Sequence, residues 1–325
     1  MEKRKLGKQG LEVSAIGLGC MGMSWLYGTP DRKESILTLE RALAMGIDFF
    51  DTAEVYGPYE NELLLGDVFR KRREQVVLAT KFGFEIVAGG VVGVNSHPRN
   101  IVRVCDESLK RLNCDYIDLF YQHRVDPGIP IEEVVGTMSE LVERGKIRYI
   151  GLSEAGPETL RRAYHTYPIS ALQTEYSLWE RGLEEKILPV CRELGIGIVP
   201  YSPLGRGLLA GQLKSLDELP ENDYRRSDPR YQGDNLSKNL KLVGKLTSLA
   251  RVYQATPAQL AIAWLLSRGS DVVPIPGTKK TRYLQENAEA VELKLSAHDL
   301  EEIAGLSAEV AGARYEPSRL ERIEQ

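Results

Sequence analysis

The chain has 325 residues, which is long enough for two ordinary domains or for one large α/β barrel. Hydrophobic residues make up 42% and charged residues 27% of the sequence, so the composition is that of a globular protein and excludes a collagen, a disordered chain and a disulfide scaffold. The formal net charge is −4, with both signs mixed along the chain, which argues against a nucleic-acid-binding surface.

The N-terminus and the cysteines indicate a protein of the reducing cytoplasm. No apolar segment follows residues 1–5, so we expect no secretory signal, and no apolar run approaches the roughly 18 residues that span a bilayer. The cysteines are Cys20, Cys105, Cys114 and Cys191. Because they lie far apart and form no CxxC motif, we expect free thiols rather than a zinc site or disulfides. Insertion into a membrane is not expected.

Short apolar runs alternate with amphipathic segments along most of the chain. Strands are predicted at residues 16–19, 47–51, 76–81, 116–122, 147–152, 170–173, 197–201 and 272–276. Helices are predicted at residues 31–45, 61–72, 98–112, 131–144, 157–164, 184–194 and 257–267. The strands are apolar almost throughout, as is typical of parallel strands that helices cover. The pattern therefore predicts a (β/α)8 barrel, also called a TIM barrel.

We expect residues 1–325 to form one domain, because no linker rich in Pro, Gly or Ser divides the chain. The one long irregular stretch is 204–235, and a loop of this length in a compact domain is usually a lid or a binding loop. Its charges fit a solvated surface loop equally well. Helical sequence at 297–306 and a polar tail predict a C-terminal extension of the barrel.

Residues 17–22 read Gly-Leu-Gly-Cys-Met-Gly and match the GxGxxG pattern of dinucleotide-binding folds. In those folds a helix begins directly after the glycines, so that its N-terminal N–H groups face the pyrophosphate. Here helical sequence begins only near Asp31, and Arg41 stands where an acidic ribose ligand is required. We therefore interpret these glycines as a tight turn at the end of a strand.

Three titratable residues, Asp51, Lys81 and His123, each end a predicted strand. Active sites of (β/α)8 barrels lie at the C-terminal ends of the strands, so separate strands bring these side chains to one mouth. Tyr56 follows Asp51 by five residues in a predicted turn and can fold back over the same mouth. Each residue alone also has an ordinary structural role, as a helix cap, an exposed lysine or a structural histidine.

Together these residues suit the reduction of a carbonyl group, which needs a hydride at carbon and a proton at oxygen. Tyrosine has an ordinary pKa of about 10, and a cationic Lys81 held by Asp51 would lower that pKa. A neutral His123 could donate a hydrogen bond to the substrate oxygen. No metal is required, and the other histidines form no HxxxH or HxH pair.

The segment 51–57, Asp-Thr-Ala-Glu-Val-Tyr-Gly, resembles the DTAxxYG signature of the aldo-keto reductase family. Lys81 and His123 match the two remaining catalytic positions of that family, and the similarity extends nearly from end to end of the chain. The resemblance implies a (β/α)8 barrel that binds NADP(H) and reduces aldehydes or ketones to alcohols. It also implies that Asp51, Tyr56, Lys81 and His123 are catalytic and that Tyr56 is the proton donor.

The resemblance further implies a cofactor site at the strand ends. Ser153 and Gln173 match residues that hold the nicotinamide carboxamide, and Tyr201 matches the aromatic residue that stacks on the ring. Glu154 replaces the asparagine of the family's GxSN segment. Lys279 would pair with a 2′-phosphate, which favours NADP(H) over NAD(H). The expected cofactor-binding residues are Gly19, Cys20, Met21, Ser153, Glu154, Gln173, Tyr201, Ser202, Pro203, Leu204, Gly205, Arg206, Gly277, Thr278, Lys279, Tyr283, Glu286 and Asn287.

A small carbonyl compound is the expected substrate, with Trp25, Tyr56 and His123 as its binding residues. Further aromatic candidates for an apolar pocket are Tyr27, Tyr59, Phe82 and Trp179. Two alternatives stay open. Lys81 could form a Schiff base, as in class I aldolases, or the protein could be a non-catalytic regulatory subunit that senses NADPH, like proteins resembling this family that associate with membrane channels.

Overall fold

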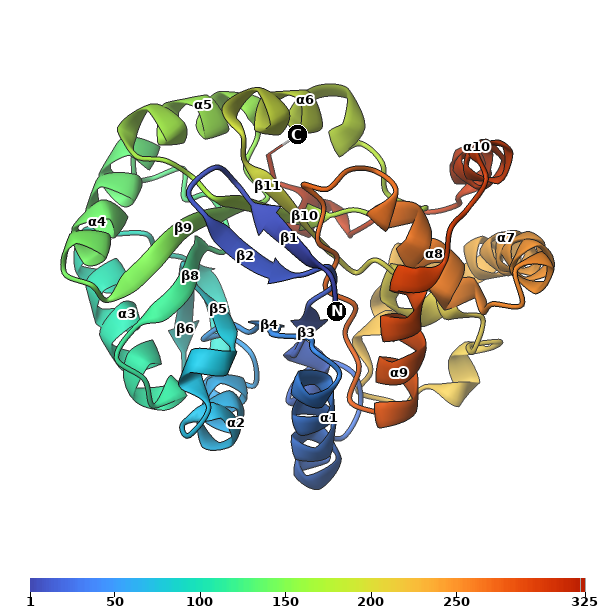
Figure 1. The fold of residues 1–325 in the computed structure, drawn as a ribbon, viewed down its shortest axis with the longest axis horizontal. Coiled ribbons are helices and arrows are strands. Elements are labelled where there is room, and N and C mark those ends of the chain that lie inside the picture. Colours follow the sequence, from blue (N-terminus) through green and yellow to red (C-terminus); the bar gives the residue numbers. More distant parts are fainter. Residues whose placement is uncertain (322, 325) are drawn as a thin grey trace.

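Seven parallel strands form most of the wall of a barrel in the computed structural model, which describes residues 1–321, 323 and 324 (Figure 1). They are hydrogen-bonded in the order β11-β10-β9-β8-β5-β4-β3. Their bounds are β3 Leu18–Gly19, β4 Phe49–Asp51, β5 Val77–Phe82, β8 Ile117–Gln122, β9 Ile147–Ser153, β10 Ala171–Glu175 and β11 Gly197–Tyr201. Each of these strands was predicted, with bounds that differ by at most a few residues.

The eighth predicted strand, 272–276, closes the barrel without forming a regular ladder. Ile198 of β11 forms an isolated parallel bridge with Val272, and Gly19 of β3 forms another with Gly277. Two prolines in this segment lack the N–H group that a ladder requires, which explains why the pairing stays irregular. The (β/α)8 barrel predicted from the sequence is confirmed.

Helices follow the strands and surround the barrel (Figure 1). Their bounds are α1 Arg32–Ala44, α2 Glu60–Phe69, α3 Pro98–Leu112, α4 Ile131–Glu143, α5 Pro157–Thr166, α6 Leu183–Leu194, α7 Gly233–Val252, α8 Pro257–Leu266, α9 Thr281–Glu289, α10 Ala297–Gly305 and α11 Pro317–Leu320. Proline in the first turn of α3, α5 and α8 fixes the backbone for helix entry. Within the described chain, no helix has both the length and the apolar character to cross a membrane.

An N-terminal hairpin, β1 (Lys3–Leu6) and β2 (Leu11–Ser14), fills one end of the barrel and was not predicted. Leu6, Leu11 and Val13 are buried and pack with residues of the barrel interior. A Cβ atom at Gly197, the first residue of β11, would lie 2.8 Å from the Cα atom of Leu6. The hairpin therefore lies at the N-terminal ends of the strands and leaves the other end open.

A second unpredicted hairpin, β6 (Phe84–Val87) and β7 (Gly90–Val94), follows β5 at the open end of the barrel. The predicted irregular stretch 204–235 contains several short 3₁₀ helices and ends where α7 begins at Gly233. The loop is therefore slightly shorter and more structured than the sequence indicated.

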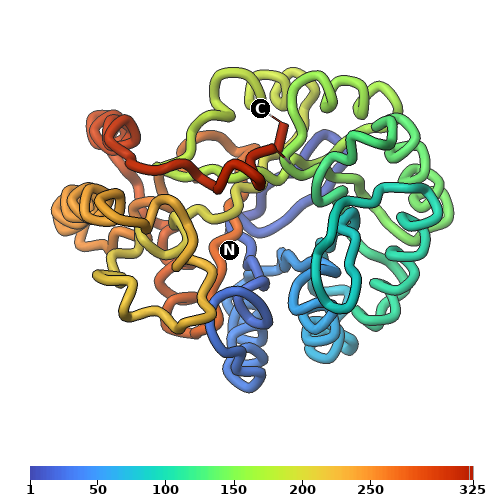
Figure 2. Tube along the Cα trace, turned by 180° about the vertical axis from the view of Figure 1, so that it is seen from behind, coloured from blue at the N-terminus to red at the C-terminus, as the bar shows by residue number. Residues whose placement is uncertain are grey.

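The C-terminal segment after α10 crosses the end of the barrel opposite the N-terminal hairpin (Figure 2). Asn239 of α7 holds its start through two hydrogen bonds with the backbone of Ala311, both 2.9 Å long. At its far end, Glu324 accepts a hydrogen bond from the Gly156 N–H at 2.8 Å, just before α5. The predicted C-terminal extension thus spans the mouth from α7 to α5.

Candidate active site

A cavity of about 650 Å³ opens at the C-terminal ends of the strands, and its lining is mostly apolar. Its floor comes from the ends of β3, β4, β8, β9, β10 and β11. Its walls come from the loop after β3, the tip of the β6–β7 hairpin, the loop after β11 and the C-terminal segment. This is the end of the barrel at which (β/α)8 enzymes carry their chemistry.

Lys81 of β5 joins three of the predicted catalytic residues into one hydrogen-bonded unit. Its side chain is fully buried, and Nζ donates to Asp51 Oδ1 at 2.5 Å and to the Thr52 carbonyl at 2.6 Å. The same Nζ atom lies 3.3 Å from the Tyr56 hydroxyl. The lysine therefore connects the carboxylate at the end of β4 to the phenol in the following turn.

Asp51 is held from a second side by β10. Gln173 Nε2 donates to Asp51 Oδ2 at 2.7 Å, so both carboxylate oxygens are occupied. Burial raises the pKa of Asp51 and lowers the pKa of Lys81, and the ion pair between them opposes both shifts. Because further hydrogen bonds satisfy each partner, the pair can stay charged although it is buried.

Tyr56 is 8% exposed at the bottom of the cavity. Burial holds the pKa of its hydroxyl well above the ordinary value, and the negative charge of Asp51 raises it further, while the cation of Arg124 opposes both. The sequence analysis expected Lys81 to lower this pKa, but the net shift is upward, because burial and the charge of Asp51 outweigh the opposing cation. Tyr56 therefore keeps its proton at neutral pH.

His123 lies at the end of β8, beside two aromatic rings. Its ring centroid is 5.9 Å from that of Tyr56 and 4.7 Å from that of Phe84, with edge-on geometry in both pairs. Burial lowers its pKa well below 6.5, and the charges of Lys81 and Arg124 lower it further. Nδ1 is buried without a hydrogen-bond partner among the described residues. The neutral imidazole predicted from the sequence agrees with this shift, and the other ring nitrogen can face a ligand.

The predicted aromatic residues separate into two groups. Trp25 and Tyr27 line the cavity. Phe82 and Trp179 are buried in the hydrophobic core, and Tyr59 lies before α2 with the Arg111 guanidinium 4.6 Å from its ring centroid. None of these last three residues lines the cavity, so they are not pocket residues.

The cavity residues that the sequence analysis did not predict include Phe84, Arg124 and Tyr315. Arg124 directly follows His123 at a strand end, so the rule that located His123 could have found it. Phe84 follows the glycine after β5, a position that indicates only a turn. Tyr315 has no local signal, since its hydroxyl reaches the Tyr201 hydroxyl at 2.8 Å across 114 positions of sequence.

Most predicted cofactor residues line the same cavity, namely Gly19, Cys20, Met21, Ser153, Gln173, Tyr201, Ser202, Pro203, Leu204, Arg206, Gly277, Thr278, Lys279 and Tyr283. Glu286 and Asn287 line an adjoining cavity of about 260 Å³, to which Leu204 and Gly277 also contribute. The two cavities form a groove from the barrel mouth to the start of α9. Within the described residues, Glu154 and Gly205 line neither of them.

Glu154 contacts the C-terminal segment instead. Its Oε1 atom accepts hydrogen bonds from the Glu175 N–H at 3.0 Å and from Arg314 Nη2 at 2.6 Å. Arg314 also donates to the Tyr201 hydroxyl at 3.1 Å. The carboxylate that replaces the family's asparagine therefore anchors the segment that covers the mouth.

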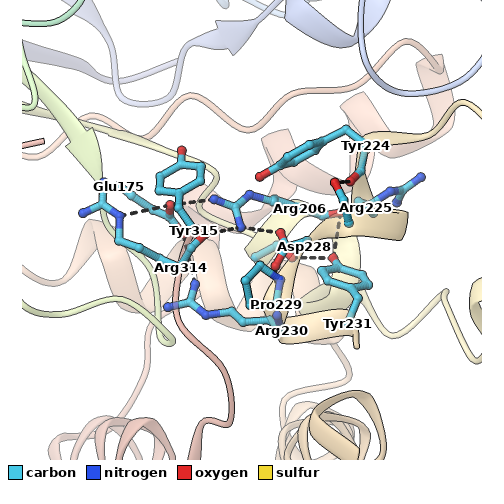
Figure 3. A network of polar contacts seen from close by, with 12 residues as sticks. Glu175, Arg206, Tyr224, Arg225, Asp228, Pro229, Arg230, Tyr231, Arg314 and Tyr315 are labelled. Carbon is cyan, nitrogen blue, oxygen red and sulfur yellow. Dashed lines mark hydrogen bonds and ion pairs between the residues drawn. The ribbon is translucent and has the colours of Figure 1, made fainter. Parts of the chain in front are cut away.

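A buried network of ion pairs connects the loop after β11 to the C-terminal segment (Figure 3). Glu175 of β10 accepts from Arg206 at 2.9 Å and from Arg230 at 3.1 Å, and Arg314 Nε lies 3.6 Å from the same carboxylate. Arg206 also pairs with Asp228. Burial raises the pKa of Glu175, and these arginines oppose that shift. The network fixes both covering segments to the end of β10.

Lys279 joins the last segment of the barrel wall to the loop after β3. Its Nζ atom donates to the carbonyl oxygens of Tyr27 at 2.7 Å and of Thr29 at 3.1 Å. Burial lowers its pKa, and the adjacent Lys280 lowers it further. The ammonium group thus lies at the edge of the groove, where two neutral carbonyl oxygens hold it.

The position of Lys81 argues against a Schiff-base aldolase. That chemistry requires a deprotonated amine that a substrate carbonyl can reach. Lys81 is 0% exposed, does not line the cavity, and its Nζ atom contacts Asp51, Thr52 and Tyr56.

Comparisons with known proteins agree with this geometry. Residues 15–308 match the model of the Aldo/keto reductase family. A relative from Glycine max, described as probable aldo-keto reductase 1, is 50% identical over 315 residues, which cover 96% of this chain and 91% of the relative.

Solved structures show the same similarity. The glycerol dehydrogenase of Gluconobacter oxydans has a TM-score of 0.87 and 27% identity, covering 97% of this chain and 98% of that chain. An aldo-keto reductase of Bacillus halodurans in its holo form has a TM-score of 0.80 and 29% identity, covering 98% and 99%. A thermostable aldo-keto reductase in complex with the inhibitor epalrestat has a TM-score of 0.77 and 31% identity, covering 94% and 100%. The chain therefore belongs to the aldo/keto reductase family, whose members are oxidoreductases that act on small carbonyl compounds and generally use NAD(P)H.

Proposed function

We propose that this protein reduces aldehydes or ketones to alcohols with NADPH as the hydride donor and Tyr56 as the proton donor. One observation carries the proposal: Lys81 Nζ lies 3.3 Å from the Tyr56 hydroxyl and 2.5 Å from Asp51, directly below an apolar cavity that His123 also lines. A protonated phenol and a neutral imidazole then meet at the place where a carbonyl oxygen would bind.

The residues of the groove fit a nicotinamide dinucleotide. The end near Tyr56 is apolar and offers Tyr201 as a stacking partner, whereas the far end carries Lys279 and Lys280 and leads to the N-terminus of α9. The reduced nicotinamide ring at one end of such a cofactor is uncharged, whereas the phosphates towards its other end are anionic. When bound, it supplies the hydride.

Two side chains would hold the carboxamide of the nicotinamide ring. Gln173 Nε2 already donates to Asp51, so its carbonyl oxygen is the atom that can accept from an amide. The Ser153 hydroxyl lines the same part of the cavity. Glu154, whose carboxylate pairs with Arg314, has no part in this contact.

Tyr56 delivers the proton to the oxygen of the reduced substrate. An alkoxide is a stronger base than a phenolate, so the transfer is favourable even though burial raises the pKa of Tyr56. Lys81 stabilises the phenolate that forms, and His123 donates a hydrogen bond that orients the carbonyl oxygen. Part of segment 204–235, which contributes Leu204 and Arg206 to the cavity wall, covers the cofactor in this proposal.

The sharpest test is Tyr56→Phe. A general acid contributes about 10² to 10⁴ to the rate, so kcat for aldehyde reduction should fall by that factor while NADPH binding, followed by fluorescence, stays measurable. Tyr59→Phe is the matched control, because Tyr59 lies outside the cavity, and it should leave kcat unchanged. A near-normal kcat in Tyr56→Phe would exclude Tyr56 as the acid.

Wild-type protein that binds NADPH but reduces no reactive aldehyde would support the alternative of a non-catalytic regulatory subunit.

A further inference from the structure

Arg124 brings into the active-site cavity a cation that forms no ion pair among the described residues. It follows His123 at the end of β8, is partly buried and lines the cavity. Its Nη1 atom donates to the His123 carbonyl at 2.6 Å and to Ser153 Oγ at 3.3 Å. Among the described residues, Nε and Nη2 have no hydrogen-bond partner and no carboxylate lies within ion-pair distance.

Arg319, exposed at the edge of this cavity, likewise forms no ion pair among the described residues. Three less exposed arginines around the cavity differ from Arg124 in having acidic partners. The pairs are Arg206–Glu175, Arg225–Asp223 and Arg314–Glu154. Desolvating a guanidinium without a partner is costly, so an unpaired arginine in a largely apolar cavity requires an explanation. Asp126, two residues further along the chain, accepts hydrogen bonds from the Ser96 and Gly128 N–H groups. The charge of Glu154 raises the pKa of Arg124, but this carboxylate is already paired with Arg314.

The location of Arg124 relates it to the substrate. Its charge is close enough to Tyr56 and His123 to shift the pKa of both side chains. These are the residues that would contact the carbonyl oxygen, and the facing walls, from Trp25 and Phe84, are apolar. A ligand that spans this space therefore meets one cation next to the reacting group and hydrocarbon elsewhere.

We propose that Arg124 binds a carboxylate of the substrate, so that the preferred substrates are aldehydes or ketones that carry a carboxylate group. The guanidinium edge formed by Nε and Nη2 offers two parallel donors, which match the two oxygens of a carboxylate. The inference rests on the proposed function, since it names the substrate class of the same cavity.

The test compares substrates that differ only in charge. Initial rates with NADPH give kcat/KM for 3- and 4-carboxybenzaldehyde and for the corresponding carbamoylbenzaldehydes, whose amides have nearly the same shape. We expect the wild-type protein to prefer the carboxylates. Arg124→Met should reduce the ratio of carboxylate to amide kcat/KM by at least about tenfold, as expected for a lost charge-assisted hydrogen bond. Because each ratio is taken within one variant, general effects on hydride transfer cancel.

Two further variants make the result specific. Arg124→Gln keeps a donor near Ser153 without the charge, and it should lose the preference as Arg124→Met does. Arg319→Met removes an exposed cation at the edge of the same cavity and should leave the ratio unchanged. An unchanged ratio in both Arg124 variants would overturn the inference, and so would an equal loss in Arg319→Met. A rise in the Kd for NADPH with an unchanged ratio would overturn it in favour of a contact between Arg124 and the cofactor.

A binding measurement separates this inference from the proposed function. Calorimetric titration of benzoate and benzamide into the protein saturated with NADP+ needs no turnover. Benzoate binding that exceeds benzamide binding and disappears in Arg124→Gln supports the anion site even if no aldehyde is reduced. Equal binding of the two probes overturns it, even if neutral aldehydes are reduced.

Discussion

We propose that Lys279 discriminates between NADPH and NADH. Its ammonium group is held by the carbonyl oxygens of Tyr27 and Thr29, which are neutral acceptors. A 2′-phosphate would add an anion to this site. Lys279→Ala should therefore raise KM for NADPH by about tenfold, the effect of one charge-assisted hydrogen bond, and change KM for NADH little. Steady-state kinetics with both cofactors measure the difference, and equal effects would refute the assignment of the 2′-phosphate to Lys279.

Glu54 makes stability depend on pH. It lies between Asp51 and Tyr56 in sequence, is 2% exposed, and its Oε1 atom has no hydrogen-bond partner among the described residues. Burial raises its pKa from 4.5 to about 8, and Glu62 adds to the shift. Between these two values the folded protein keeps a proton that the unfolded chain has released. Stability contributed by this group is therefore fully present below pH 4.5 and is lost as the pH rises through 8.

Glu54→Gln tests this linkage, because glutamine stays neutral at every pH. The Tm of the variant should exceed that of the wild type by about 2–4 °C at pH 8.5, where the wild-type carboxyl must ionise, and the advantage should vanish at pH 5. Thermal unfolding followed by circular dichroism measures both. Glu74→Gln, at an exposed site, is the control and should not alter the pH dependence. The same gain at both pH values would contradict the argument.

At the scale of single residues, the sequence predicted which side chains meet at the barrel mouth better than it predicted the pKa shifts of those side chains. Asp51, Lys81 and His123 could be found because polar residues that end apolar runs must emerge at one end of a parallel barrel. The pKa direction of Tyr56 could not be found, since it depends on the burial of the phenol and on its distance from Asp51. Both are properties of the assembled mouth rather than of the local sequence.

At the scale of elements, we predict how the ion pair of the C-terminal segment contributes to the free energy of unfolding. Arg314 is 12% exposed and pairs with Glu154 at 2.6 Å. Removing one partner of a buried ion pair leaves the other uncompensated, so Arg314→Met should lower the free energy of unfolding by about 3–5 kcal/mol. Urea denaturation at neutral pH measures the loss.

A double-mutant cycle identifies the cause of the stability loss in Arg314→Met. Glu154→Gln together with Arg314→Met should cost less than the sum of the single changes by at least about 1 kcal/mol, because the pair is removed as a unit. Strictly additive effects would mean that Arg314 stabilises the segment without a contribution from its pair with Glu154.

The elements that the sequence analysis missed fall into two kinds. The β6–β7 hairpin and α7 had readable signals: Ala88 and Gly89 form a turn between two short runs, and Leu236, Leu240 and Val243 follow a helical period. The N-terminal hairpin had almost none, because three of the four residues in β1 are charged. Its role follows from Leu6 and Leu11, whose partners lie in the barrel interior.

For the whole molecule, the two ends of the barrel differ in structure and in proposed role. The end with the N-terminal hairpin is closed by apolar packing, and the opposite end holds the cavity, the buried ion pairs and the covering segments (Figures 1 and 2). The alternation of apolar and amphipathic segments was sufficient to predict this architecture, since few folds accommodate eight such units. The pairing of distant segments, such as Glu154 with Arg314, depends on three-dimensional closure and could not be predicted.

The tip of the β6–β7 hairpin is a natural target for directed evolution. Gly90 lines the cavity, and a Cβ atom there would meet only the Val87 carbonyl oxygen, at an ordinary 3.7 Å. A library of side chains at this position would reshape the entrance while leaving the barrel core and the residues around Lys81 untouched. Substitutions at Gly90 should therefore change which substrates enter the cavity without altering the catalytic residues or the barrel that carries them.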